Sequence, residues 1–126
     1  MTTINYNTIP EFEKDFKKLS KRFKTLERDF ELMKKNLLEV HYLKGIPVPP
    51  KALVDIEGFC NDCYKSQKVR KFACASLKGK GGNSGIRVIL VYEKDEQKIT
   101  FIEIYFKGDS ENEDGERLKK FVRSLD

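Results

Sequence analysis

The sequence predicts a small α+β domain in which a pair of helices precedes an antiparallel sheet. Apolar residues recur at helical spacing over residues 10–40, and β-branched and aromatic runs fill much of residues 68–107. Helices and strands that are segregated along a chain are typical of the α+β class. A chain of 126 residues with nine Phe and five Tyr has the length and the bulky apolar material for one core, so we expect a single domain spanning 1–126.

The N-terminal part predicts one short strand and a helical hairpin. Residues 4–8 alternate in polarity, and Pro10 suits the first turn of a helix. Thr25 is a suitable cap for a second helix, and the turn between the two helices is too short for anything but an antiparallel pair. The apolar stripes are Phe12, Phe16, Leu19 and Phe23 on the first helix, and Leu26, Phe30, Met33, Leu37 and Val40 on the second.

Residues 41–66 predict a long connection. Gly45 and three prolines, Pro47, Pro49 and Pro50, interrupt any regular element. Loops of this length are uncommon in compact domains. We therefore expect this region to contain a short helix of its own.

Three strands and a final helix complete the prediction. The strands are expected at residues 68–77, 86–93 and 99–107. A glycine-rich link at 78–85 and a tight link at 94–97 are short enough to make the three strands an antiparallel meander. Residues 111–125 begin acidic, end basic and carry an apolar stripe, which favours an amphipathic helix. That stripe consists of Leu118, Phe121, Val122 and Leu125.

Positive charge is concentrated in one segment. The net charge is +5, and residues 65–87 contain seven basic residues and no Asp or Glu. Such a block attracts an anionic polymer, although a solvated basic face is the alternative interpretation. The seven residues are Lys65, Lys68, Arg70, Lys71, Lys78, Lys80 and Arg87.

Several other classes of function are disfavoured. No stretch approaches the ~20 apolar residues of a membrane span, and residues 1–10 do not have the pattern of a secretory signal. Three cysteines are an odd number, which favours a reducing compartment, so we expect a cytoplasmic protein. Cys60 and Cys63 have zinc-like spacing, with Cys74 and His41 as conceivable further ligands, but there is only one such pair and we expect no metal site.

Three segments resemble a known family. Ser84-Gly85-Ile86-Arg87 resembles the S-G-x-R pattern at the entry to the second sheet hairpin in RelE/ParE-type bacterial toxins. Residues 104–108 resemble the end of the last strand of that family, and residues 12–19 resemble its Lys-rich first helix. The order of elements agrees over nearly the whole chain. The chain departs from the family in its longer 41–66 region and in having no His near the last strand.

The resemblance implies a RelE-like fold and a toxin of a type II toxin–antitoxin system. Most members of the family cleave mRNA on the ribosome, so it implies an endoribonuclease with no metal or organic cofactor. The implied partners are a cognate antitoxin and mRNA on the ribosome. Two alternatives stay open: a ParE-like inhibitor of DNA gyrase, and a non-catalytic nucleic-acid-binding member of the family.

Cleavage by the 2′-OH of the RNA itself needs groups that bind phosphate and transfer protons. Arg87 matches the family's arginine and is the first candidate, as a phosphate clamp; the alternative is an ordinary strand arginine in solvent. Tyr105 and Lys107 lie two apart, on the same face as Glu103. Tyr105 as a proton acceptor would need its pKa lowered by Arg87 and Lys107, and the alternative is simple sheet packing.

The remaining candidates come from the basic block. Arg70 and Lys71 point to opposite faces of the expected strand, so only one of them can share the surface of Arg87. Alternation does not choose between them, because both faces carry apolar residues. We include Lys71 among the catalytic candidates. The candidates for RNA binding are Lys68, Arg70, Lys78 and Lys80.

Overall fold

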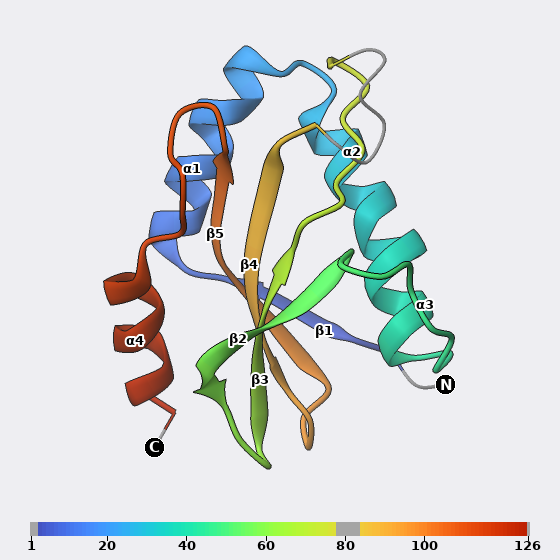
Figure 1. The fold of residues 1–126 in the computed structure, drawn as a ribbon, viewed down its shortest axis with the longest axis vertical. Helices are drawn as coiled ribbons and strands as arrows, with labels where there is room; N and C mark the ends of the chain where they lie inside the picture. The colour runs from blue at the N-terminus through green and yellow to red at the C-terminus, as the bar shows by residue number, and fades with distance from the viewer. Residues whose placement is uncertain (1–2, 78–83, 126) are drawn as a thin grey trace.

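The computed structural model describes residues 3–77 and 84–125 and confirms the α+β class. In the described part of the chain, one five-stranded sheet has the order β1-β5-β4-β3-β2. Strands β2 to β5 form an antiparallel meander, and β1 joins the edge of the sheet parallel to β5. The strands are β1 Asn5–Thr8, β2 Leu53–Cys60, β3 Tyr64–Val69, β4 Ile86–Glu93 and β5 Lys98–Phe106 (Figure 1).

The predicted helical hairpin is present. Helix α1 (Pro10–Arg22) begins with proline, whose missing N–H has no helical partner to lose. Helix α2 (Leu26–Met33) continues through a π-helical turn, η1 (Lys34–Leu38), into α3 (Glu39–Tyr42). Figure 1 shows α2 and α3 at one side of the sheet and the C-terminal helix α4 (Gly115–Arg123) at the other.

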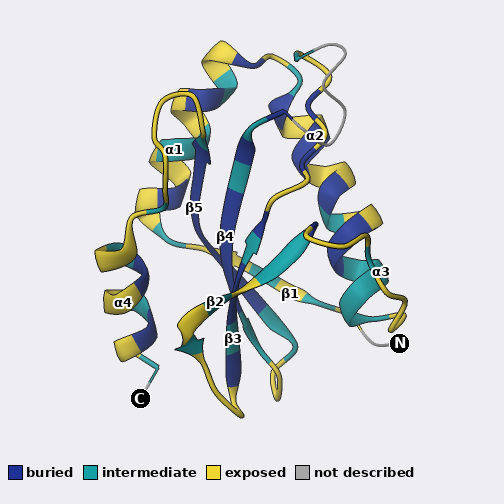
Figure 2. Ribbon diagram, viewed as in Figure 1, coloured by how far each residue is buried: buried dark blue, intermediate teal, exposed yellow. Residues whose placement is uncertain are grey.

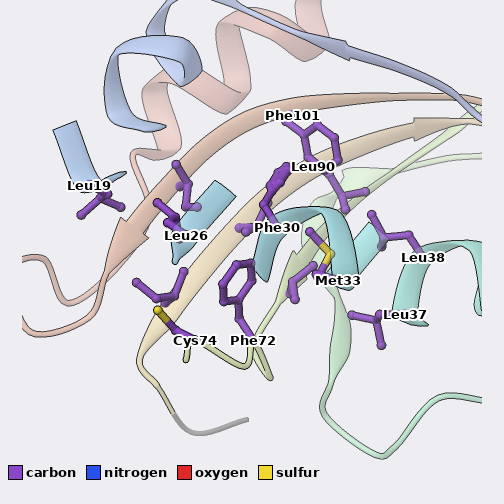
Figure 3. Close-up of a cluster of buried hydrophobic side chains, with 14 of the residues drawn as sticks. Leu19, Leu26, Phe30, Met33, Leu37, Leu38, Phe72, Cys74, Leu90 and Phe101 are labelled. Atoms are coloured by element: carbon purple, nitrogen blue, oxygen red, sulfur yellow. The ribbon is translucent and has the colours of Figure 1, made fainter. Parts of the chain in front are cut away.

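One face of the sheet packs against the helical hairpin through aromatic side chains. The ring of Phe101 on β5 lies 4.8 Å from Phe30, 5.6 Å from Phe12 and 5.8 Å from Tyr6, between ring centres. Figure 3 shows side chains of the helices meeting those of the strands in this cluster. Burial of this aromatic surface stabilises the fold.

The opposite face is covered only in part, by α4. Leu118 and Val122 of this helix pack on Ile89, Val91 and Ile102 of the sheet. The helix turns its apolar stripe inward and leaves its outer surface exposed (Figure 2). The helix starts at Gly115, later than the predicted 111, because the side chain of the preceding residue, Asp114, accepts a hydrogen bond from the Arg117 N–H and caps it.

The prediction for residues 41–66 was wrong. The region contains β2 and the first part of β3, joined by a turn that includes Cys63. The turn is stabilised by Asn61, whose side-chain oxygen accepts hydrogen bonds from the N–H groups of Cys63 and Tyr64. The polar residues of β2 hid this strand from the sequence, because β2 is an edge strand and much of its side-chain surface faces solvent.

The strand predicted at 68–77 was misplaced. β3 starts four residues earlier, at Tyr64, and ends at Val69. Beyond it the chain leaves the sheet, and Phe72 and Cys74 enter the core beneath the helices. This shift decides which basic residues share a surface.

Candidate functional site

A polar cleft lies on the face of the sheet that α4 covers only in part. It has a volume of about 230 Å³ and is bounded by β2, β3, β4, the end of β5 and the loop that follows it. Five of the predicted site residues line it, although they are spread over 40 positions of the chain. The lining residues are Val54, Lys68, Arg70, Arg87, Tyr105, Lys107, Glu111 and Asn112.

The Ser84-Gly85 pair fixes the corner of this cleft. The buried hydroxyl of Ser84 donates a hydrogen bond to the carbonyl of Phe72 and accepts one from the Ile86 N–H. Gly85 has a φ of +89°, a backbone conformation that residues with a side chain rarely adopt. Its carbonyl accepts a 2.8 Å hydrogen bond from the Lys107 N–H. The motif therefore joins the segment after β3, the start of β4 and the end of β5.

Arg87 lies directly across the strand pair from Tyr105. Its Nη1 donates a 2.8 Å hydrogen bond to the carbonyl of Arg70 and a longer one to the carbonyl of Ile86. Burial lowers the pKa of Arg87, and the neighbouring charge of Arg70 lowers it further. Both of these hydrogen bonds use Nη1, so Nε and Nη2 are left to bind an anion in the cleft.

Tyr105 is buried, and its pKa is raised to about 12. Burial is the main cause, and the carboxylates of Glu113 and Glu103 add to it; Arg87 and Arg70 oppose the rise only in part. The net lowering of the pKa that Tyr105 would need as a proton acceptor is therefore absent, although Arg87 acts in that direction. At neutral pH Tyr105 keeps its proton, so its hydroxyl can donate a hydrogen bond.

Two carboxylates that the sequence did not indicate as site residues, Glu113 and Glu103, lie beside residues that line the cleft. Lys68 Nζ forms a 2.5 Å ion pair with Glu113 Oε1, and both side chains are 19% exposed. Burial raises the pKa of Glu113, but the hydrogen bond and charge of Lys68 and a backbone hydrogen bond together outweigh burial, and the net shift of the pKa is downward. Glu103 is buried and accepts a 2.7 Å hydrogen bond from the Asp114 N–H, and its burial raises its pKa. The cleft thus combines fixed positive groups with an acidic border.

Lys71 is not in this cleft. It is exposed and borders a different hollow, against Met33 and Leu37 of the long helix that α2, η1 and α3 form together. Of the two neighbouring residues, it is Arg70 that shares the surface of Arg87, as does Lys68. Lys78 and Lys80 lie outside the described residues.

The three cysteines are in different environments. Cys60 and Cys63 are exposed near the β2–β3 turn, while Cys74 is buried in the main core. Within residues 3–77 and 84–125, no group of three or more His, Cys, Asp and Glu side chains is arranged to hold a metal ion. Across the same ranges, no helix combines the length and the apolar character needed to cross a membrane.

Comparison with known proteins identifies a shared fold. The sequence matches no protein-family model, and no curated protein matches it significantly. A solved structure, described as a metal-bound toxin from Helicobacter pylori, is similar, with a TM-score of 0.51 and 16% identity. The match covers 86% of this chain and 99% of that one. At this identity the similarity establishes the fold.

Proposed function

We propose that this protein is the toxin of a type II toxin–antitoxin system and that it cleaves mRNA on the ribosome. The observation that carries the proposal is the meeting of Lys68, Arg70, Arg87 and Lys107 around the hydroxyl-bearing Tyr105 in one cleft. Cationic groups at fixed positions suit a phosphodiester, whose cleavage accumulates negative charge. The fold shared with a bacterial toxin supports the proposal by analogy.

In the proposed reaction, the 2′-oxygen of the RNA attacks the adjacent phosphorus and the 5′-oxygen leaves. Arg87, through Nε and Nη2, binds the phosphate oxygens and stabilises their charge in the transition state. Tyr105 donates a hydrogen bond to a phosphate oxygen, which is the role that a phenol with a pKa of about 12 can fill. Lys107, exposed just after the end of β5, donates a proton to the leaving oxygen.

The mechanism also needs a group that accepts the proton of the 2′-OH. Glu111 is the carboxylate that lines the cleft. Glu113 is held by Lys68 and Glu103 by the backbone of Asp114, so both are already engaged. We therefore assign the role of general base to Glu111.

Primer extension on a defined mRNA in a bacterial translation extract tests the proposal. The wild type should give discrete cuts at codon-spaced positions, and Arg87→Ala should weaken them by roughly a hundredfold or more, as loss of an oxyanion-stabilising group does. Arg28→Ala, which removes the same charge from an exposed position on α2, should cut like the wild type.

Two results would contradict the proposal in different ways. If the wild type cuts no RNA while translation proceeds, the nuclease function is refuted, and DNA supercoiling by gyrase becomes the assay for the ParE-like alternative. If cutting survives Arg87→Ala, the function stands and the placement of its site is refuted.

The proposed inhibitor is a small acidic antitoxin that covers the cleft. Its carboxylates would pair with cations that the cleft leaves accessible, and such pairs weaken as salt rises. The neighbouring gene product should abolish the cuts when added before the mRNA. Inhibition that does not weaken in high salt would contradict a charge-based interface.

A further inference from the structure

A second hollow lies on the other face of the sheet, between β1 and the helical hairpin. Its volume is about 480 Å³, against about 230 Å³ for the polar cleft. Aromatic rings from four elements (β1, α1, α2 and β5) line it, although the neighbouring core already uses much of their surface. These rings belong to Tyr6, Phe12, Phe16, Phe30 and Phe101.

An ammonium group already occupies part of this hollow. Lys34 Nζ lies 4.7 Å from the centre of the Tyr6 ring and 5.5 Å from that of Phe30. It also forms a 2.9 Å ion pair with Glu31. Aromatic faces combined with a carboxylate are the groups that proteins use to bind organic cations. The hollow therefore has the chemistry of an ammonium receptor, and a side chain of the protein itself fills it.

The helix is irregular at this residue. The π-helical turn η1 starts at Lys34 and ends at Leu38. Such turns are rare and occur frequently at functional sites, where they redirect side chains. Here the turn follows Met33, which is buried, and places Lys34 over the rings while Leu37 and Leu38 stay in the core.

The border of the hollow is acidic on a protein that carries a net charge of +5. Glu13, Glu27 and Glu31 line it, and all three are exposed. One wall is β1, which is an edge strand and has no strand partner on its outer side in the described part of the chain. An edge strand beside a side-chain pocket is the arrangement that binds an extended peptide by strand addition.

We propose that the groove between β1, α1 and α2 binds a basic, extended segment of a partner protein. The main chain of the segment pairs with the outer edge of β1, and one Lys or Arg side chain takes the position of Lys34 over Tyr6 and Phe30. Charge complementarity with the three glutamates selects the partner. The proposal is independent of the nuclease function, because the groove and the polar cleft lie on opposite faces of the sheet.

Fluorescence anisotropy with a short labelled peptide of alternating lysine and valine tests this interface. A peptide with glutamate in place of lysine is the control probe. The wild type should bind the basic peptide only, and Glu27→Gln/Glu31→Gln should weaken binding by about tenfold, the loss of two partly exposed ion pairs. Lys34→Ala should instead tighten binding by about fivefold, because it removes the internal competitor from the rings.

Two further variants make the test specific. Glu57→Gln/Glu116→Gln removes the same charge from exposed positions elsewhere and should bind like the wild type, as should Arg87→Ala. The proposal is overturned if neither the wild type nor Lys34→Ala binds the basic peptide. It is also overturned if both double variants weaken binding equally, which indicates bulk charge, or if Lys34→Ala weakens it.

Discussion

The two faces of the sheet differ in what they hold. Along β5, Phe101 and Ile104 belong to the aromatic core under the helical hairpin, whereas Tyr105 packs on the α4 side and borders the polar cleft. Ile104 and Tyr105 are successive residues and point to opposite faces, and a register shift between β4 and β5 brings Phe101 to the same face as Ile104, so one strand serves both faces. The larger cluster of buried apolar side chains, and with it most of the burial that stabilises the fold, therefore lies on one face, while the other face holds the ionisable side chains of the cleft.

The largest effect is expected from the core face. Phe101→Ala removes a ring that contacts Tyr6, Phe12 and Phe30, and the cavity should reduce the free energy of unfolding by about 3–5 kcal/mol. Tyr105→Phe, on the other face, keeps the ring and should cost about 1 kcal/mol or less. Urea denaturation measures both. If the two variants cost the same, stability is not divided between the faces as described.

An effect of intermediate size is expected from the ion pair at the cleft. Glu113→Gln should lower the free energy of unfolding by about 1 kcal/mol, because Lys68 loses its charged partner in a mostly buried place. The same change frees the Lys68 ammonium, so binding to single-stranded RNA should become tighter and more salt-dependent. Stability and RNA affinity should thus change in opposite directions.

The pH dependence of this effect has a definite sign. The pKa of Glu113 is lowered in the folded protein, so its contribution is complete above the unfolded value of about 4.3 and is lost as pH falls through the folded pKa. Urea denaturation of wild type and Glu113→Gln should therefore differ at neutral pH and converge in acid. Glu57→Gln, from an exposed strand position, is the control. A difference that persists in strong acid would show that the ion pair is not its cause.

The smallest effect concerns Tyr105. Its folded pKa of about 12 lies above the usual 10, so the stability it contributes is present below pH 10 and is lost as pH rises through 12. The tyrosinate absorbance of wild type minus that of Tyr105→Phe should show one phenol that titrates near 12. A midpoint below 10 would restore Tyr105 as a proton acceptor and remove the case for Glu111.

Much of the fold was predictable because its signals are local. The stripe of Phe12, Phe16 and Leu19 predicts α1, and the β-branched run from Ile86 predicts β4. The candidate site was accessible for the same reason: β4 and β5 pair with Arg87 opposite Tyr105, as strands joined by a tight turn at 94–97 do. The similarity of Ser84-Gly85-Ile86-Arg87 to a known motif indicated which arginine to select.

What the sequence did not reveal depends on contacts between distant segments. The face of the sheet toward which Lys71 lies depends on where β3 ends. No sequence pattern within residues 64–77 marks that end at Val69. The pKa of Tyr105 depends on Glu113, which comes from the loop before α4. In the sequence, that loop predicts only the acidic start of a helix. Its position beside Lys68 could be seen only in the folded structure.

Two lysines three residues apart offer the most direct test of the central claim, that RNA is cleaved in the cleft on the α4 side of the sheet. Lys68 lines this cleft, and Lys71 borders a hollow against the long helix. Primer extension should be performed with Lys68→Ala and Lys71→Ala at equal concentrations of folded protein, set by circular dichroism. We expect Lys68→Ala to reduce cutting by about tenfold, because it removes a positive charge from the cleft and leaves the Glu113 carboxylate without its partner, and Lys71→Ala to cut like the wild type. Loss of cutting in Lys71→Ala with cutting retained in Lys68→Ala would contradict the account and place the site on the opposite face.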